Sequence, residues 1–463
     1  MHLVGIGGMG MAGLAQVLLD RGHRVTGEDL FDSPRTRALA ALGIPLETGR
    51  AGRLPARSAA VVASAAVPAG HPAIDEAVAR GLPVLKYARA VAEVVRGRHL
   101  LAVAGTHGKT TTTAWIAHML RLAGLEPGWI IGGEPVDLGR SGALGAGPDF
   151  ALEACEYDRS FLSYEPSIAV VTNVDADHLD VYGTLDALRE AFACFLGRVV
   201  AGGAAIVCAD DPAAAGLRVP ALVRRVSYGL LEGAQVRGEA VPGERPGETA
   251  IRIPSLGVLP VRLPGLHNAR NALAVLATAR ALGLPDAAAA AAIETFRGVR
   301  RRFEFLGDAS GVTWINDYGH HPTEIRATAE SARARFPGRR LLAFFQPHQR
   351  HRTIALFDAF AEALGAFDSV AVGEIYGARE SAAGDGSLET DLARASTRRG
   401  CPRAVHRPGL EGIAWLRDEA RPGDVAILLG AGDVGDRIEE VGRVAGFIGE
   451  AAGEARAVGA GAA

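Results

Sequence analysis

The sequence contains little cysteine, few aromatic residues and no excess of charge of one sign. Its four cysteines, Cys155, Cys194, Cys208 and Cys401, are far apart and form no Cys-x-x-Cys pair. This distribution argues against a disulfide framework and a thiolate zinc site, and it predicts a reducing, cytoplasmic location. Aromatic residues make up only 6% of the 463 residues, so we expect cores built mainly from Ala, Val and Leu.

The charge balance and hydropathy pattern exclude several classes of protein. The sequence has 49 Lys and Arg residues against 52 Asp and Glu residues, which gives no support for binding to nucleic acid or to a membrane surface. It lacks an uninterrupted apolar run long enough to span a bilayer. The apolar N-terminus has no basic leading segment and is interrupted by glycines, so we do not expect a signal peptide.

The remaining pattern is that of a globular α/β protein. At about 150 residues per domain, the length favours three domains, and short apolar runs alternate with segments of helical periodicity, which predicts parallel sheets. We expect three α/β domains in series, at 1–98, 99–297 and 298–448. Within them we expect a strand at 24–27, irregular β structure at 232–264 and one helix at 354–364. An Ala- and Gly-rich tail at 449–463 follows.

The first motif joins a predicted strand at 2–4 to a helix. It reads Gly5-x-Gly7-x-x-Gly10, with Gly8 inside it, and Glu28 and Asp29 follow about 19 residues later. Such glycines let a pyrophosphate approach the backbone, and the helix N-terminus supplies N–H donors. The motif does not separate NAD from another pyrophosphate compound, and a tight turn without a ligand is the alternative.

The second motif lies between an apolar run at 99–104 and a helix at 110–122. It consists of Gly105, Thr106, His107, Gly108, Lys109, Thr110 and Thr111. Consecutive N–H groups in such a loop can surround phosphate oxygens, while Lys109 neutralises β/γ charge and the Thr110 hydroxyl holds Mg²⁺. Val103 stands where the strict P-loop pattern has glycine, so the loop is a shorter variant.

Further motifs follow in order along nearly the whole chain, and together they resemble those of the Mur ligase family. They are Glu153-Ala-Cys-Glu-Tyr-Asp158, Thr172-Asn173 with Asp177-His-Leu-Asp180, Leu263-Pro-Gly-x-His-Asn-x-x-Asn271, Arg301-Arg302, Asp317-Tyr-Gly-His-His-Pro-Thr-Glu324 and Phe345-Gln-Pro-His348. The last two runs resemble the alanine-adding branch of the family.

This resemblance implies an ATP-dependent ligase. Its first domain would be Rossmann-like, its central domain P-loop ATPase-like and its third domain a Rossmann-like α/β domain. It would join L-alanine to the lactyl carboxylate of UDP-N-acetylmuramate through an acyl phosphate, with ATP and two Mg²⁺ ions. We expect a monomer or homodimer that binds neither nucleic acid nor membrane. Closure about a hinge near Gly298 would complete the site.

The resemblance also implies roles for individual residues. The catalytic residues would be Lys109, Glu156, His178 and His348, and the Mg²⁺ ligands Thr110, Glu156 and His178. ATP would contact residues 105–111 together with Asn268, Arg302 and Asp317. The substrates would contact Gly7, Gly8, Met9, Gly10, Asp29, Ser64, His320 and Arg352. Four of these residues have a plainer alternative: helix capping for Asn268, a solvated charge for Arg302, a surface carboxylate for Glu156 and a structural imidazole for His178.

Two departures from the family pattern leave questions open. Cys155 stands where many relatives have Asp, so any help to the metal shell falls to Glu153 or Asp158. Gln349 stands where relatives usually have Arg, and Arg350 could supply the missing charge. The second departure concerns amino-acid selectivity more than the reaction.

Three rival functions remain at this point. A related ligase attaches a recycled tripeptide to the same sugar nucleotide and shares the phosphate loop. A nicotinamide oxidoreductase would explain the first glycine motif but not Lys109. A catalytically inactive regulatory paralogue has only Cys155 in its favour.

Overall fold

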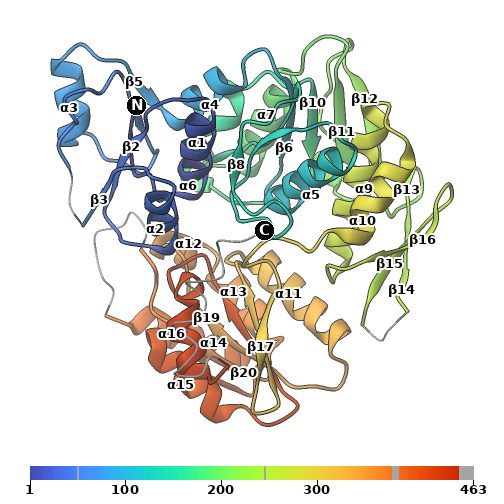
Figure 1. Ribbon diagram of the computed structural model, residues 1–463. Helices are drawn as coiled ribbons and strands as arrows, with labels where there is room; N and C mark the ends of the chain where they lie inside the picture. The colour runs from blue at the N-terminus through green and yellow to red at the C-terminus, as the bar shows by residue number, and fades with distance from the viewer. Residues whose placement is uncertain (50–51, 245–246, 378–384, 448–463) are drawn as a thin grey trace. The chain divides into compact units, whose positions relative to one another are not determined.

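The computed structural model describes residues 1–49, 52–244, 247–377 and 385–447, so the predicted tail lies outside the described residues. The chain forms two compact units. The first comprises Met1–Val241, Thr249–Arg262 and Leu266–Val299, and the second comprises Pro242–Glu248, Leu263–Gly265 and the chain from Arg300 onward. Three separate, largely parallel sheets follow one another along the sequence (Figure 1), which confirms the α/β class and the three domains in series.

The first sheet is five-stranded, parallel and ordered β3-β2-β1-β4-β5. Its strands are β1 (His2–Val4), β2 (Thr26–Asp29), β3 (Leu46–Thr48), β4 (Val61–Ala63) and β5 (Val84–Lys86), and its helices are α1 (Met9–Asp20), α2 (Pro34–Ala41), α3 (Pro72–Ala79) and α4 (Tyr87–Val95). The strand order reverses between β1 and β4. In open α/β sheets, ligands bind beyond the strand ends at such a point.

The second strand differs from its prediction at 24–27. It begins at Thr26 and includes Glu28 and Asp29, which the prediction placed after the strand. Glu28 is buried, and its carboxylate lies 3.6 Å from His2 Nε2 and 3.6 Å from His71 Nε2. The carboxylate of Glu28 can therefore occupy a buried strand position, because imidazoles from two other segments surround it. The residues next to Glu28 in the sequence give no sign of these contacts.

The second sheet has eight strands in the order β13-β12-β11-β10-β6-β9-β7-β8. Its strands are β6 (His99–Ala104), β7 (Gly128–Ile130), β8 (Gly142–Ala143), β9 (Asp149–Glu153), β10 (Ile168–Val171), β11 (Ala204–Cys208), β12 (Arg224–Gly229) and β13 (Val236–Arg237). Only the edge strand β8 pairs antiparallel among these described strands. Strand β6 lies between β9 and β10 in this sheet, and the loop with the second glycine motif follows β6. Side chains at the ends of all three strands therefore meet this loop.

Helices flank this sheet, and a small antiparallel sheet follows it. The helices are α5 (Lys109–Leu122), α6 (Leu179–Tyr182), α7 (Leu185–Leu196), α8 (Pro212–Ala215), α9 (Leu266–Ala281) and α10 (Asp286–Thr295), with the 3₁₀ segment η1 (Tyr157–Ser163). The predicted β structure at 232–264 is confirmed as β13 followed by β14 (Glu239–Pro242), β15 (Thr249–Ile253) and β16 (Gly257–Val261). Helix α5 is buried along most of its length, and Trp115 stacks on Phe296 at 4.8 Å.

The third sheet has six strands in the order β17-β18-β22-β19-β20-β21. They are β17 (Glu304–Ala309), β18 (Val312–Asp317), β19 (Leu341–Phe345), β20 (Ser369–Val372), β21 (Arg403–His406) and β22 (Val425–Leu429), and β17 alone among them is antiparallel to its neighbour. The helices are α11 (Pro322–Arg335), α12 (Arg350–Ala355), α13 (Phe357–Leu364), α14 (Ser387–Arg398), α15 (Gly409–Glu419) and α16 (Ile438–Ala445), with η2 (Val434–Asp436).

The single helix predicted at 354–364 is wrong. Helix α12 ends at Ala355 and α13 begins at Phe357, because Leu356 leaves the helical region with φ −113° and ψ 21°. Leu356 packs against the core cluster that contains Phe360. Packing against the sheet thus interrupts a segment whose periodicity alone favours one helix.

No helix in the described segments combines the length and apolar character needed to cross a membrane.

Candidate active site

The loop after β6 depends on glycine at two positions. Gly105 has φ 136°, and a Cβ there would lie 2.0 Å from Thr172 Oγ1. Gly108 has φ 81° at the N-cap of α5, where a Cβ would lie 3.0 Å from Asn271 Oδ1. Both conformations strain residues with side chains. Thr172 and Asn271, from two other predicted motifs, therefore lie directly against this loop.

The segment after β10 fixes the loop by hydrogen bonds. Asn173 Oδ1 accepts from the His107 N–H at 2.8 Å, and the Thr172 hydroxyl donates to the His107 carbonyl at 2.6 Å. Thr106 N–H donates to the Asn173 carbonyl at 3.1 Å. These contacts hold the backbone of the loop in one shape, as a pre-organised phosphate site requires.

Lys109 is the charged centre of the loop. Its Nζ donates to the carbonyls of Gly105 (2.5 Å) and Thr106 (3.0 Å) and to Glu156 Oε1 (2.9 Å). Burial opposes the charged form of the lysine, but attraction to Glu156 outweighs it and raises the pKa of Lys109 above its usual value. The predicted lysine and carboxylate thus form a buried ion pair in which the lysine keeps its positive charge.

Hard oxygen atoms gather beside this pair. Glu153 Oε1 accepts from the Thr110 hydroxyl at 3.0 Å, and its Oε2 accepts from the Gly132 N–H at 2.6 Å. Glu156 is almost fully buried, and among the described residues its Oε2 has no hydrogen-bond partner. An ionised oxygen left in this condition is costly, so these residues fit a divalent cation with a preference for oxygen ligands.

His178 lies on a neighbouring segment. It is the N-cap of α6 in a left-handed conformation (φ 53°), and its ring meets the edge of the Tyr157 ring at 5.2 Å. Tyr182, in the same short helix, donates to the Glu156 carbonyl at 2.6 Å. Contacts from Tyr157 and Tyr182 therefore place the segment of His178 beside that of Glu156.

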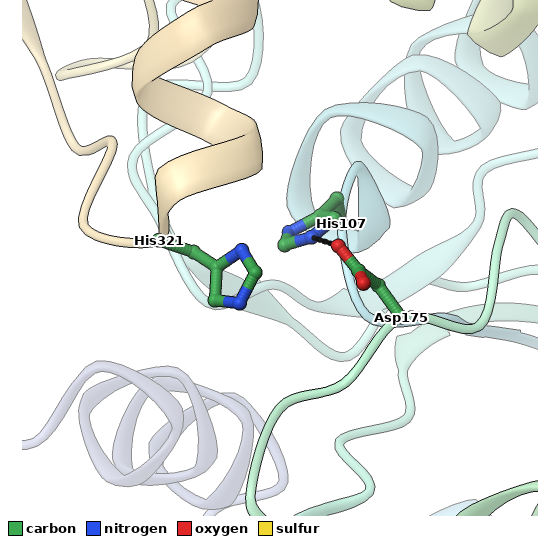
Figure 2. Close-up of side chains that lie close together, drawn as sticks. All are labelled: His107, Asp175 and His321. Atoms are coloured by element: carbon green, nitrogen blue, oxygen red, sulfur yellow. Dashed lines mark hydrogen bonds and ion pairs between the residues drawn. The ribbon is translucent and has the colours of Figure 1, made fainter. Parts of the chain in front are cut away.

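His107 has a partner that sequence reasoning missed. Its Nε2 lies 3.0 Å from Asp175 Oδ2, as Figure 2 shows. Asp175 lies within a motif stretch, but the prediction singled out Asp177 instead. Figure 2 also shows His321, which in the second unit caps α11 and accepts from the Thr323 N–H at 3.3 Å.

The two asparagines of α9 take different positions. Asn271 lies against Gly108, and its Nδ2 donates to Asn268 Oδ1 at 3.2 Å. Both side chains are buried. Asn268, a predicted ATP contact, is therefore oriented by Asn271, which itself borders the loop.

The first glycine motif forms the expected turn between β1 and α1. Gly5 has φ 75°, and a Cβ there would lie 3.0 Å from Ser64 Cβ. The Gly7 N–H donates to Asp29 Oδ2 at 2.8 Å. The structure thus brings Gly7, Asp29 and Ser64 together at the ends of β1, β2 and β4, although the Gly7 N–H is already used within the protein.

At some positions of this turn, glycine is required because neighbouring protein side chains leave no space for a Cβ. A Cβ on Gly7 would lie 2.9 Å from Asp29 Oδ2, and one on Gly10 would lie 2.7 Å from Tyr87 Oη. At Gly8 the nearest atom would be 3.5 Å away. Gly8 is therefore the most open of these positions, and Met9 follows it as the first residue of α1.

The third domain brings three predicted residues together. Arg352 NH1 lies 3.2 Å from His348 Nδ1, and the rings of His320 and His348 are 5.6 Å apart. Tyr376, which sequence reasoning missed, stacks on His348 at 5.9 Å. Tyr376 lies outside every recognised motif, so no local signal could have identified it.

The linker into the third domain contains two arginines around one aromatic ring. The guanidinium carbons of Arg301 and Arg302 lie 4.8 Å and 4.9 Å from the centre of the Tyr318 ring. Arg302 NH1 lies 3.7 Å from Glu324 Oε1, whereas Arg301 is buried and pairs with Asp436 at 2.8 Å. Arg302, the predicted nucleotide contact, is thus the more exposed of the two, and Arg301 anchors the linker.

Asp317 is occupied by contacts within its own domain. Its Oδ1 accepts from the Gly319 N–H and the Thr328 hydroxyl, and its Oδ2 accepts from the Phe303 N–H. Burial raises the pKa of Asp317, although Arg302 and these N–H donors oppose the shift. The carboxylate therefore stabilises the turn after β18, whatever further contact it makes.

The departure at Cys155 has a structural counterpart. Burial raises the pKa of this thiol to about 12, so it carries no charge near neutral pH. Of the two proposed substitutes, Asp158 pairs with Lys86 at 2.9 Å, whereas Glu153 contacts Thr110. Of these two carboxylates, Glu153 is therefore the one that faces the loop and could replace the charge that Cys155 lacks.

Comparison with known proteins identifies the family. Family models match residues 1–99 (Mur ligase family, catalytic domain), 103–279 (Mur ligase middle domain) and 301–432 (Mur ligase, glutamate ligase domain). The chain is 42% identical over 452 residues to the UDP-N-acetylmuramate–L-alanine ligase of Variovorax paradoxus, covering 94% of this chain and 92% of the relative. It is 44% identical to the enzyme of the same name from Methylibium petroleiphilum, with 94% and 95% covered.

Solved structures agree with these matches. The UDP-N-acetylmuramate-alanine ligase of Thermotoga maritima has a TM-score of 0.78 at 28% identity, covering 95% of this chain and 98% of its own. A murein peptide ligase from Psychrobacter arcticus has a TM-score of 0.74 at 25% identity, with 97% and 99% covered. The order of the motifs, the three sheets and these matches over nearly the whole length agree, and the chain belongs to the Mur ligase family.

Proposed function

We propose that the protein ligates L-alanine to the lactyl carboxylate of UDP-N-acetylmuramate at the expense of ATP, in the synthesis of peptidoglycan precursors. The single observation that carries this proposal is the buried Lys109–Glu156 pair at the strand–helix loop, in which Glu156 Oε2 has no hydrogen-bond partner among the residues that the structure describes. Relatives at 42–44% identity bear the name of this activity and match almost end to end.

The reaction requires a group that turns an unreactive carboxylate into an electrophile. A carboxylate oxygen of the sugar nucleotide attacks the γ-phosphorus of ATP, and the bond to ADP breaks. The amine of L-alanine then attacks the acyl carbon, loses a proton and expels inorganic phosphate. Because phosphoryl transfer relies on positioning and on charge, a rigid loop with a charged lysine supplies what the first step needs.

The oxygen atoms beside the loop fit Mg²⁺. The Thr110 hydroxyl, Glu153 and Glu156 form the hard donor set that this ion prefers, and Glu156 Oε2 has no hydrogen-bond partner among the described residues. When bound, Mg²⁺ neutralises charge on the β- and γ-phosphate oxygens. We propose a second ion on the His178 side, supported by the placement of α6 against the Glu156 carbonyl.

The histidines of the third domain fit the acceptor side of the reaction. His320, His348 and Arg352 lie together, and the planar guanidinium group of Arg352 suits a carboxylate.

We expect Arg352→Ala to raise the KM for L-alanine about tenfold or more and to leave the KM for ATP nearly unchanged. Steady-state kinetics measure both values. The matched control is Arg394→Ala, an exposed arginine of α14, which should change neither value. A raised KM for ATP with an unchanged KM for L-alanine would contradict the assignment.

The amine specificity is the test of the proposed function. Phosphate release from ATP should require UDP-N-acetylmuramate and should be fastest with L-alanine. One methyl group is worth about 1–3 kcal/mol, so glycine should have a kcat/KM lower by roughly 10- to 200-fold. Likeness to a murein peptide ligase makes the tripeptide the essential competitor. Faster reaction with the tripeptide would overturn the alanine assignment, and reduction of NAD without ligation would overturn the ligase.

Several finer proposals accompany this function. We propose domains at 1–98, 99–297 and 298–448, which the ranges of the family models support. We also propose a cytoplasmic monomer or homodimer that uses UDP-N-acetylmuramate and L-alanine. The four cysteines, all unpaired, suit a reducing compartment.

A further inference from the structure

Helix α1, which begins at the first glycine turn, packs on the edge of the central sheet. A Cβ on Gly142 of β8 would lie 2.1 Å from the Gly13 carbonyl oxygen, so the two backbones are in direct contact. Gln16 Oε1 accepts from the Gly142 N–H at 2.8 Å, and Asp20 Oδ2 accepts from the Leu144 N–H at 3.0 Å. Side chains of α1 therefore satisfy the backbone of an edge strand, and the glycine turn is held against the central domain within one compact unit.

Tyr87 is the first residue of α4 and lies beside the N-terminus of α1. A Cβ on Gly10 would come within 2.7 Å of its Oη, so any larger residue at position 10 would displace this hydroxyl. The ring of Tyr87 packs against the core cluster of the first unit. Among the described residues, however, its hydroxyl makes no hydrogen bond. A phenylalanine would provide the same packing, so the structure leaves the hydroxyl without an internal purpose.

The surroundings of this hydroxyl keep it protonated, and the start of α1 lies close to the phosphate loop. A Cβ on Gly133 would lie 2.9 Å from Thr110 Cγ2 and 4.0 Å from Met9 Cε. Burial, followed by the neighbouring Tyr164 and Glu153, raises the pKa of Tyr87 well above its usual value. Glu153 is the carboxylate that accepts from the Thr110 hydroxyl. Tyr87 is therefore a hydrogen-bond donor at neutral pH, and its hydroxyl lies beside the start of α1.

We propose that Tyr87 is a substrate-binding residue whose hydroxyl donates a hydrogen bond to an anionic oxygen of the sugar nucleotide. This inference rests on the proposed function. Two groups of that substrate share the required chemistry: the diphosphate, which a helix N-terminus favours, and the lactyl carboxylate, which must approach the loop of Lys109 and Thr110. A donor at the start of α1, the end of that helix near Thr110, would orient the substrate from the turn toward the phosphate loop.

The test is Tyr87→Phe in the full-length protein. Since the hydroxyl makes no hydrogen bond within the described part of the chain, the variant should melt at the wild-type temperature. We expect the Kd and KM for UDP-N-acetylmuramate to rise about tenfold or more, because hydrogen bonds to charged groups are among the strong ones. The KM for ATP should stay within about twofold. Tyr164→Phe is the matched control, because it removes a neighbouring buried hydroxyl and should leave both values unchanged.

Calorimetry with UDP and with UDP-N-acetylmuramate distinguishes the two acceptors. An equal loss of affinity for both ligands identifies the diphosphate, and a loss for UDP-N-acetylmuramate alone identifies the carboxylate. Affinity for UDP-N-acetylmuramate within twofold of wild type in Tyr87→Phe would overturn the inference. If the wild-type protein itself does not bind UDP-N-acetylmuramate, the proposed function has failed instead, so the two failures are separable.

Discussion

Replacement of Lys109 by methionine is expected to lower the ligation rate by about a thousandfold or more. Methionine keeps much of the length and apolar volume of the side chain but removes the charge that Glu156 keeps in place. A single preorganised contact to a transferring group typically contributes a factor of about 10²–10³, and a full charge on a phosphoryl group belongs at the upper end. The measurement is phosphate release under saturating ATP, UDP-N-acetylmuramate and L-alanine.

Two controls separate loss of chemistry from loss of fold. Lys86, the only other lysine in the sequence, is exposed and pairs with Asp158, so Lys86→Met should stay within about twofold of wild type. Lys109→Met leaves Glu156 buried without its partner and should lower the melting temperature. Adding Glu156→Gln should restore the melting temperature but not the activity. Retention of more than about a tenth of wild-type activity by Lys109→Met would refute the assignment.

Glu156→Gln is expected to have the second largest effect. The amide keeps the shape of the side chain, but it removes the charge that faces Lys109 and the anionic oxygen proposed for Mg²⁺. We expect kcat to fall about a hundredfold or more and half-maximal activity to require more Mg²⁺, because a neutral oxygen is a weaker ligand for a hard cation. Titration of the rate with Mg²⁺ measures both changes.

The matched control for this variant is two residues away on the same segment. Asp158→Asn removes a carboxylate that is partly exposed and pairs with Lys86, so its Mg²⁺ dependence should match that of wild type. An unchanged Mg²⁺ requirement in Glu156→Gln, together with near-normal kcat, would show that Glu156 serves only to balance the charge of Lys109.

The sequence was sufficient to place both phosphate-type turns. Each has glycine between an apolar strand and a helix, and the backbone at Gly5, Gly105 and Gly108 adopts positive φ as such turns require. The predicted partners of the second loop, Thr172 and Glu156, meet it because parallel strands end at the same edge of the sheet. Local chemistry and sheet topology therefore determine this part of the site.

The remaining features depend on contacts between segments far apart in the chain. Glu28 occupies a buried strand because His2 and His71 surround it, and Asp175 matters through His107. Tyr376 stacks on His348 with no sequence pattern of its own. Such partners become visible only when the fold brings the segments together, so residue types and spacing could not predict them.

The linker illustrates the same limit within one motif. The prediction assigned nucleotide binding to Arg302 and gave no role to its neighbour. In the structure Arg301 is the buried residue, and it donates to the Gly430 and Gly432 carbonyls in addition to pairing with Asp436. Two adjacent arginines have the same chemistry, and only the direction of the backbone decides which one anchors the third domain.

The most direct test of the central claim is to follow an oxygen atom through the reaction. UDP-N-acetylmuramate labelled with ¹⁸O in its lactyl carboxylate is incubated with the enzyme, ATP, Mg²⁺ and L-alanine, and both products are analysed by mass spectrometry. Activation of the carboxylate by ATP predicts that each phosphate released carries one labelled oxygen and that the sugar nucleotide gains one alanine residue. Release of unlabelled phosphate, or ATP hydrolysis without the alanine adduct, would contradict the account.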